Sequence, residues 1–392
     1  MGYDNGVNLL SIAAPIFPLL NINPVTHFLY FEFILGKQMG NNIILFLFSL
    51  FSILNLASCN TTEPPNNNNN GQDTTSQDFT FENFEFGDRQ TTSYFNDVWI
   101  FDENNIWAVG YISPTDTTIN GKYITNPNII KWDGISWKLQ PFSGTSNGID
   151  GIWALDTSLI YFANGIVVKY QNGNYKYENF NNVPLSNSQR VEKLWGSAEN
   201  NIWGVGPWGT VVHYNGFDWQ KIDFDTQWYF YDITGNPNTG IAYASATNNQ
   251  DIRIIVELNI STPNIIHQSE QITAVKSDAI KFIGYFLYNA GSDFSSTLLW
   301  RLNINTGRID SLFVLNPTIA INRITGEKNN DIFYWGDDYG GNNMTHFNGI
   351  RYKTFNLFGR SYSRGGAHTK DDISVVVGSL ISKGYITVVT RR

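Results

Sequence analysis

The chain has 392 residues, of which 15% are aromatic and only 15% are charged, and its formal net charge at pH 7 is −9. So few charged residues argue against long charged helices and coiled coils. A net negative charge argues against non-specific binding to nucleic acid, which needs a basic face. Cys59 is the only cysteine, so an internal disulfide and a cysteine zinc cluster are excluded, and the five histidines lack metal-ligand spacing. We therefore expect no nucleic-acid partner, no metal and no cofactor.

The first 58 residues read as segments that precede the folded part. Residues 1–38 are apolar but are interrupted by three prolines, so they fit neither a membrane span nor a set of strands, and we interpret them as an extension upstream of the true start. From Met39 onwards, the apolar run Ile43–Leu54 has the length of a signal-peptide core and is too short to span a bilayer. Residues 39–58 are therefore predicted to be a signal peptide. Met39–Asn42 lack the usual positive charge and Lys37 lies just upstream, which leaves the start codon open.

The apolar run ends in Leu56-Ala57-Ser58-Cys59, which resembles the lipobox of bacterial lipoproteins. The resemblance implies that Cys59 is acylated and that the protein is exported and lipid-anchored to the bacterial cell envelope, at the outer membrane, so that the membrane is a partner. Three acyl chains, as the family carries, exceed what stable anchoring needs. The alternatives are an ordinary signal peptide with a chance cysteine, or an apolar membrane anchor.

The segment after the cysteine predicts a flexible spacer. Residues 60–77 read NTTEPPNNNNNGQDTTSQ and contain no apolar side chain. Such a segment cannot bury enough surface to offset its chain entropy. We therefore interpret residues 59–78 as a disordered, Asn-rich tether that holds the remainder of the chain, 79–392, away from the membrane.

The stretch Leu194–Trp219 contains the clearest strand pattern. Short apolar runs at 194–196, 202–206, 210–214 and 217–224 predict four antiparallel strands in series. Asn215-Gly216 predicts a type I′ hairpin between the third and fourth strands. A single sheet of this size would expose an apolar face, so it must pack against copies of itself.

Copies of this unit recur along the chain. Asn105–Gly110 reads NIWAVG and Asn201–Gly206 reads NIWGVG. Further Asx-Gly turns, each followed by an aromatic residue, occur at 133–134, 172–173 and 348–349. The isoleucines expected to mark the second strand of each unit are Ile106, Ile160, Ile202, Ile241, Ile280, Ile332 and Ile373. Their mean spacing of about 44 residues lies within the range of about 40–45 residues for propeller blades. The chain is therefore predicted to be all-β, a seven-bladed β-propeller of four-stranded antiparallel blades.

The two ends of the propeller are predicted to complete one blade together. The last unit shows only three strands and ends at 385–390, whereas Phe79–Phe86 alternates aromatic and polar residues just before the first blade. We expect 79–86 to pair with 385–390 and close the ring. The repeat resembles the tryptophan-rich propeller repeats of exported bacterial proteins. The Asp-box motif is absent as such.

Candidate site residues follow from this architecture, because propellers usually bind at the channel mouth. The residues expected to open the inner strands and face a ligand there are Asp97, Asp150, Glu192, Asp232, Arg323 and His368. One interpretation is a ring of carboxylates that grips a cation or supplies the acid and base of a glycosidase. The other is that these acids only end strands and turns.

Two further segments are candidate sites. Trp208 lies in a predicted tight turn and is the candidate exposed aromatic residue, whereas most other aromatic residues are expected in the core. The polar loop 337–343 lacks the ligand spacing of a calcium loop and is expected to be a surface turn. No catalytic residue and no metal ligand is assigned.

The function expected from these features is that of a membrane-anchored cell-envelope lipoprotein whose propeller binds or scaffolds a protein or a glycan without turnover. The alternative is a carbohydrate-active enzyme, a glycoside hydrolase or glycosyltransferase-like protein that uses channel-mouth carboxylates. The enzyme predicts two carboxylates in a deep pocket, at least one with a raised pKa. The binding module predicts a shallow face with exposed Trp or Tyr, and a purely structural protein predicts neither.

Overall fold

The computed structural model describes residues 74–392 except for 88–91, 113–117, 120–121, 124–127, 143–147, 179–184, 224–227, 249–251, 262, 269–278, 293–295, 316–318, 339–340, 358–364 and 381. The expectations for the upstream extension, the signal peptide, Cys59 and most of the tether lie outside the described residues. Within the described part, no helix is long and apolar enough to cross a membrane.

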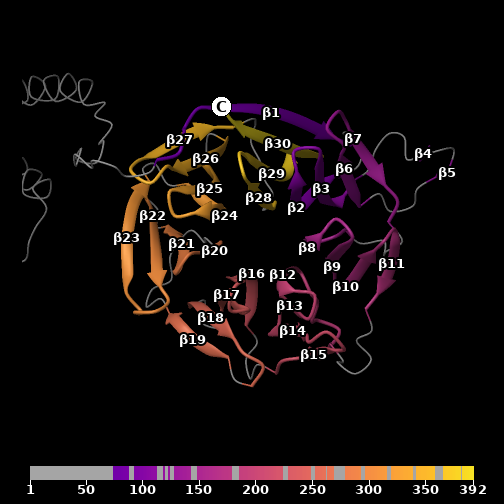
Figure 1. Cartoon of the computed structure of the whole chain (residues 1–392), viewed down its shortest axis with the longest axis horizontal. Helices are drawn as coiled ribbons and strands as arrows, with labels where there is room; N and C mark the ends of the chain where they lie inside the picture. The colour runs from indigo at the N-terminus through magenta and orange to yellow at the C-terminus, as the bar shows by residue number, and fades with distance from the viewer. Residues whose placement is uncertain are drawn as a thin grey trace, which may run out of the picture. The chain divides into compact units, whose positions relative to one another are not determined.

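Seven four-stranded antiparallel sheets form a ring, with the first strand of each sheet nearest the centre (Figure 1). Blade 1 consists of β2 (Tyr94–Asp102), β3 (Asn105–Tyr111), β6 (Ile129–Trp132) and β7 (Trp137–Gln140), and blade 2 of β8 (Gly151–Asp156), β9 (Leu159–Asn164), β10 (Ile166–Gln171) and β11 (Asn174–Tyr177). Blade 3 consists of β12 (Lys193–Ala198), β13 (Asn201–Gly206), β14 (Thr210–Tyr214) and β15 (Trp219–Lys221), and blade 4 of β16 (Tyr229–Asn236), β17 (Ile241–Thr247), β18 (Arg253–Leu258) and β19 (Asn264–Gln268).

Blade 5 consists of β20 (Ile280–Ile283), β21 (Phe286–Ser292), β22 (Thr297–Asn303) and β23 (Ile309–Leu315), and blade 6 of β24 (Ala320–Lys328), β25 (Asp331–Asp338), β26 (Gly341–Phe347) and β27 (Tyr352–Asn356). Blade 7 consists of β28 (Ala367–Lys370), β29 (Ile373–Leu380), β30 (Lys383–Arg391) and β1 (Phe79–Phe86). The short strands β4 (Thr118–Ile119) and β5 (Lys122–Tyr123) pair separately in the β3–β6 connection. The predicted seven-bladed propeller is confirmed.

The second-strand assignment is correct in six blades and wrong in one. Ile106, Ile160, Ile202 and Ile332 are buried in second strands, and Ile373 begins β29. Ile241 begins the second strand β17 but is 37% exposed, and its buried neighbour Ala242 fills the core there. Ile280 lies in β20, which is an inner strand, and β21 is the true second strand. The error occurs in blade 5, which has no Asx-Gly turn to mark strand register.

The same Asx-Gly signature forms two different turns. At Asn172-Gly173 both residues have positive φ, +49° and +84°, and the flanking residues pair directly, as in a type I′ turn. At Asn215-Gly216 only the glycine has positive φ, and the Asn215 side chain accepts the backbone N–H groups of Phe217 and Asp218. The predicted hairpin at 215–216 therefore forms, but the predicted type I′ turn is wrong. The reason is that an Asx turn adds two residues to the loop, which also leaves Phe217 90% exposed.

The hydrophobic core consists of layers between neighbouring blades. One cluster joins Trp203 and Val211 of blade 3 to Phe230 and Ala244 of blade 4, and similar clusters join blades 1 and 2 and blades 5 and 6. The Asn of the repeated Asn-Ile-Trp segment has a polar role in these layers. The Asn201 side-chain oxygen accepts the indole N–H of Trp203 at 3.1 Å, which removes a buried unpaired donor.

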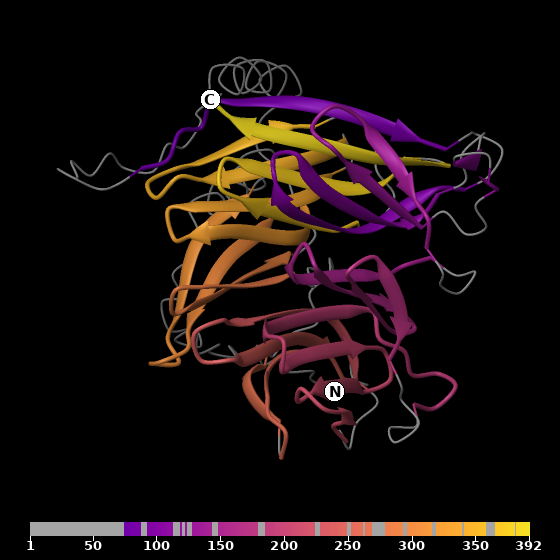
Figure 2. The ribbon, with the colours of Figure 1, turned by 45° about the vertical axis from the view of Figure 1, so that its right-hand side comes forward.

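The ring closes as the alternating pattern of Phe79–Phe86 predicts. β1 pairs antiparallel with β30 in continuous register from Phe79 opposite Arg391 to Phe86 opposite Gly384. Figure 2 shows the indigo β1 lying beside the yellow β30 along the edge of the wheel. The N-terminal strand thus supplies the outermost strand of the last blade.

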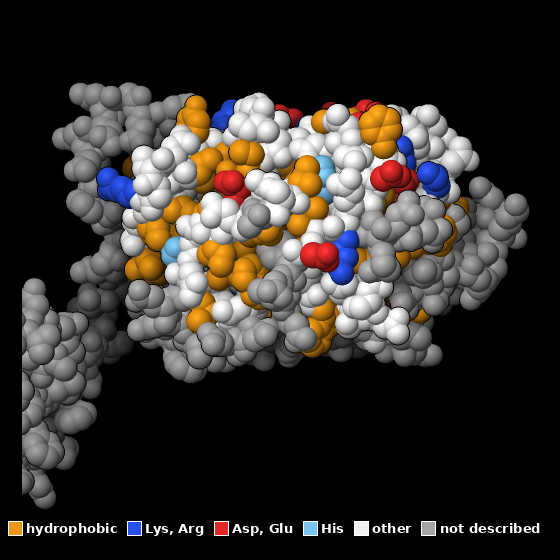
Figure 3. All heavy atoms as spheres, turned by 90° about the horizontal axis from the view of Figure 1, so that it is seen from below, with side chains coloured by type: hydrophobic (Ala, Val, Ile, Leu, Met, Phe, Trp, Pro, Cys, Tyr) orange, Lys and Arg blue, Asp and Glu red, His pale blue; other side chains and the backbone are white. Residues whose placement is uncertain are grey.

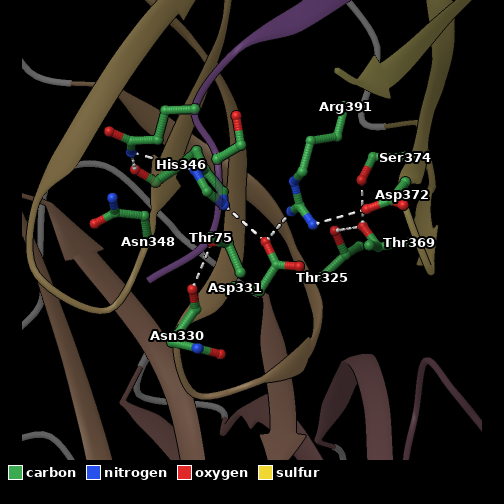
Figure 4. Close-up of polar contacts among 12 residues, drawn as sticks. Thr75, Thr325, Asn330, Asp331, His346, Asn348, Thr369, Asp372, Ser374 and Arg391 are labelled. Carbon is green, nitrogen blue, oxygen red and sulfur yellow. Dashed lines mark hydrogen bonds and ion pairs between the residues drawn. The ribbon is translucent and has the colours of Figure 1, made fainter. Parts of the chain in front are cut away.

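A buried polar cluster lies beneath the start of this closing strand (Figure 4). Nε2 of His346 lies 2.8 Å from Oδ1 of Asp331, and the Arg391 guanidinium also pairs with that oxygen. The Gln77 amide nitrogen lies 3.2 Å from Nδ1 of His346. Because an amide NH₂ can only donate, Nδ1 accepts and Nε2 carries the proton that Asp331 receives. Burial lowers the pKa of His346, which keeps this neutral tautomer.

Phe79 links the closing strand to the last two blades. Its ring packs edge-on against Phe333, His346 and Phe355 at centroid distances of 5.8, 5.1 and 5.4 Å.

Substitution Phe79→Ala should lower the free energy of unfolding by about 2 kcal/mol, roughly half the cost of deleting a fully buried Phe. Urea unfolding measures this change. Phe81→Ala is the control, because that ring is 36% exposed and contacts only Phe355 among the described rings. An equal loss in both variants would mean that the strand end does not hold the ring closed.

Candidate functional site

The structure separates the six candidate residues into two groups. Asp97, Asp232, Arg323 and His368 line the central channel between the inner strands. Asp150 and Glu192 do not line it. Asp150 instead lines a pocket formed where the inner strands begin, and Glu192 lies close enough for its charge to act on Asp150.

Asp150 and Glu192 were predicted to face the channel, but each lies one residue before the position that matches Asp97. Asp97 pairs with Val109, and the matching pairs in blades 2 and 3 are Gly151 with Ala163 and Lys193 with Val205. Asp150 and Glu192 each stand one residue before the matching position, and neither of them lines the channel. The spacing to the following tryptophan marks the true equivalents. Trp99, Trp153 and Trp195 each stand two residues after Asp97, Gly151 and Lys193.

The channel aspartates bind backbone rather than forming an open ring of carboxylates. Asp97 accepts the N–H of Val98 at 3.0 Å with one oxygen and the N–H of Ile152, in the next blade, at 3.3 Å with the other. Asp232 repeats this arrangement with Ile233 at 3.0 Å and Ile280 at 3.3 Å. Each aspartate thus joins one inner strand to the next. Burial raises the pKa of Asp232, and the nearby Arg323 and Lys193 charges oppose that rise.

Cations balance these carboxylates. Lys193 Nζ donates to Asp97 Oδ2 at 3.1 Å and to the backbone oxygens of Asn96 and Asp150 at 3.3 and 3.0 Å. Lys281 also lines the channel. The channel therefore carries both signs of charge, and Lys193 and Lys281 are the residues that sequence reasoning missed. No group of three or more metal-ligating side chains occurs among the described residues.

A second candidate site lies on the face where the inner strands begin, which we call the first face. A pocket of about 590 Å³ is bounded there by Tyr94, Tyr111, Asp150 and Arg190 with several small residues. The two tyrosine rings lie 6.0 Å apart. Burial and the Glu192 charge raise the pKa of Asp150 to about 6.

Contacts extend this face across blades 3 and 4. Arg190 pairs with Glu192, whose other oxygen accepts the Tyr229 hydroxyl at 3.2 Å. Tyr229 stacks on Tyr231 at 4.6 Å. Trp208, in the β13–β14 turn, has its backbone oxygen bonded by the Gln189 amide at 3.1 Å. The face therefore combines aromatic rings with a fixed ion pair.

Trp208 has the most unusual geometry of these residues. Its side chain is 51% exposed and its φ is +59°. A bulky residue other than glycine rarely adopts this conformation, which costs about 1–2 kcal/mol. Gly209 follows at +67°, and its N–H binds the Trp228 oxygen, so the turn is held in place from blade 4. The polar loop 337–343 includes two residues outside the described part, and its Asp337 accepts a hydrogen bond from the Asn322 amide at 2.7 Å.

No protein-family model and no curated protein matches the chain. Among solved structures, it is similar to "YCF48 bound to D1 peptide" at 11% identity, with 80% of this chain and 97% of that chain covered and a TM-score of 0.54. It is similar to a chain of the "Mitotic Checkpoint Complex" at 10% identity, with 84% and 96% covered and a TM-score of 0.53.

A third similar structure is the extracellular domain of the putative one component system BT4673 from B. thetaiotaomicron, at 11% identity and a TM-score of 0.53. The match covers 78% of this chain but only 39% of that chain. At these identities the likeness shows the fold alone, and the fold that it shows is the β-propeller.

Asp150 should cost the protein stability at neutral pH. Its pKa is higher in the folded state, about 6 against 3.8, so its contribution to stability falls as pH rises through that interval. Asp150→Asn should therefore raise the free energy of unfolding by about 1–2 kcal/mol at pH 8, allowing for solvent screening, and should match the wild type below pH 4. Urea unfolding at several pH values measures this. Asp223→Asn, whose side chain is 89% exposed in the native protein, is the control. A pH-independent difference would show that Asp150 does not titrate in this way.

Proposed function

We propose that this protein is an exported, membrane-anchored lipoprotein of the bacterial cell envelope whose propeller binds a protein partner through the first face. The observation that carries the binding function is Trp208, a large aromatic side chain that is half exposed on a backbone conformation unfavourable to it. Strain of this kind persists where the residue serves something other than stability. Exposed tryptophans are among the strongest anchors of protein interfaces.

The surroundings of Trp208 support a protein partner. Tyr94 with Tyr111 and Tyr229 with Tyr231 supply further aromatic surface, and Arg190 with Glu192 supplies charge. Tyrosine, tryptophan and arginine are the residue types enriched in protein interfaces. The similar structure of YCF48 carries a bound D1 peptide. In contrast, the described edge of the wheel in Figure 3 is mostly neutral, with scattered apolar side chains and few charges.

A glycan or a carbohydrate-active enzyme is the competing proposal. The raised pKa of Asp150 beside Glu192 meets one condition of an acid–base pair. However, the Glu192 carboxylate is bound by Arg190 and by the Tyr229 hydroxyl, so both of its oxygens are engaged. A general base or nucleophile needs an oxygen that can reach the substrate. We therefore favour binding without turnover.

Trp208→Asn tests the binding face. Asn tolerates positive φ, so the variant should be as stable as the wild type or more stable, yet partner binding should fall at least tenfold because the anchor is gone. Pull-down from envelope extract with residues 74–392, followed by titration of the recovered protein, measures the affinity. Phe217→Ala is the matched control, since Phe217 is 90% exposed at the opposite end of blade 3. Equal losses in both variants, or none in Trp208→Asn, would contradict the proposal.

The membrane anchor rests on the Leu-Ala-Ser-Cys segment at 56–59. Cys59→Ser should move the protein from the membrane fraction to the soluble fraction, because serine cannot be S-acylated and loss of the acyl chains removes the anchor. Cell fractionation and detergent partitioning measure this. Ser58→Ala, which keeps the cysteine, should stay in the membrane fraction. Membrane association of Cys59→Ser at wild-type level would exclude lipid anchoring at this residue.

A further inference from the structure

The central channel contains a cavity of about 330 Å³ with two chemically different walls. Blades 1, 2 and 3 contribute one tryptophan each, Trp99, Trp153 and Trp195, from matching positions on their inner strands. Blades 5 and 6, on the other side of the ring, contribute Lys281 and Arg323. The cavity size falls at the lower end of small-molecule sites, about 300–1,000 Å³.

Most of the charged groups in this cavity are already engaged. Both oxygens of Asp97 and of Asp232 accept backbone N–H groups. The Lys193 ammonium has three donors and makes three hydrogen bonds. These groups hold the inner strands together, and none of them needs a ligand to be satisfied.

Lys281 differs from these groups. Among the described residues, its ammonium makes no hydrogen bond and no ion pair, although it lies in the channel wall. The carboxylates that act on it at longer range are Asp232 and Glu327, and both are bonded to backbone N–H groups elsewhere. Burial lowers the pKa of Lys281. A partly desolvated ammonium without a partner is costly, so an anion that entered the channel would gain a charge-assisted hydrogen bond.

His368 offers a second unused donor in the same cavity. Its Nδ1 accepts the backbone N–H of Ile100 at 3.2 Å, and its ring stacks on Trp99 at 4.4 Å. Burial, together with the Lys281 and Lys370 charges, lowers the pKa of His368 to about 3, so the ring is neutral at pH 7. A neutral imidazole whose Nδ1 accepts must carry its proton on Nε2. No described residue accepts that proton.

We propose that the channel binds a small organic anion, a carboxylate attached to an apolar body. The carboxylate is placed at Lys281 and the Nε2–H of His368, and the apolar body lies against the tryptophan wall. Three cationic side chains face two anionic ones in the described lining, within a chain whose net charge is −9. Such a local excess of positive potential in a low-dielectric cleft attracts anions. The cavity shares no lining residue with the first-face pocket, so this site is separate from the protein-binding face.

The test compares ligands that differ in one property. Calorimetry and tryptophan fluorescence are recorded on residues 74–392 and on the full chain with 3-phenylpropionate, its uncharged amide and inorganic phosphate. The acid should bind at least tenfold more tightly than the amide, which lacks the charge, and than phosphate, which lacks the apolar body. Lys281→Gln should weaken acid binding at least tenfold, as expected from losing a hydrogen bond to a charged group.

Two control variants make the result specific. Lys328→Gln removes the same charge from an exposed position on β24 and should bind the acid like the wild type. Lys281→Arg keeps the charge and should retain most of the affinity. Urea unfolding of each variant shows that the fold is kept, and Lys281→Gln should still bind the protein partner through Trp208. Equal binding of acid and amide, equal binding of acid and phosphate, or no acid binding at millimolar concentration would each overturn the proposal.

Discussion

The structure depends on how the unpaired backbone N–H groups at the inner edge of each blade find hydrogen-bond acceptors. Every inner strand has one side without a strand partner, and its outward N–H groups would be left unpaired against the channel. Side chains of the preceding blade accept these groups. Asp97 binds the next inner strand at Ile152, Asp232 does so at Ile280, and Thr234 binds Phe282 at 3.1 Å. At these two junctions, between blades 1 and 2 and between blades 4 and 5, the sheets are therefore joined by hydrogen bonds at the centre as well as by apolar packing.

This constraint explains why acidic residues line a channel that shows no metal or catalytic arrangement in the described residues. A carboxylate can accept from its own strand and from the next strand at once, which a hydroxyl or an amide does less well. The cations then compensate the carboxylates that remain buried, as Lys193 does for Asp97. In blade 7 the same function is taken by His368, which receives the N–H of Ile100 across the closure of the ring. Because Nδ1 accepts this hydrogen bond, the neutral imidazole carries its proton on Nε2. The bond that joins blade 7 to blade 1 therefore leaves an N–H donor in the cavity.

At the rim the ring is closed by the chain ends. The alternating Phe79–Phe86 segment predicted this closure, because one face of β1 had to be covered and only the last blade lacked a fourth strand. The polar cluster under the strand was not predictable in the same way. Asp331 and His346 are separated from Gln77 by more than 250 residues, and Arg391 stands at the other end of the chain. Nothing in the local sequence of any of these residues points to the others.

The repeat of about 44 residues, the blade number and the closing strand were determined by the sequence, because each depends on hydrophobic periodicity and turn residues that are local. Strand register was not. A shift of one residue changes which side chain enters the channel, and Glu192 and Lys193 are adjacent in the sequence. The spacing to Trp195 identifies Lys193 as the equivalent of Asp97 only once the strand pairing is known. Only tertiary structure decided that Lys193 and Lys281 enter the channel while Asp150 and Glu192 lie on the first face. The strain at Trp208 was also invisible, since a positive φ at a tryptophan is imposed by the contacts around the turn and not by the residue itself.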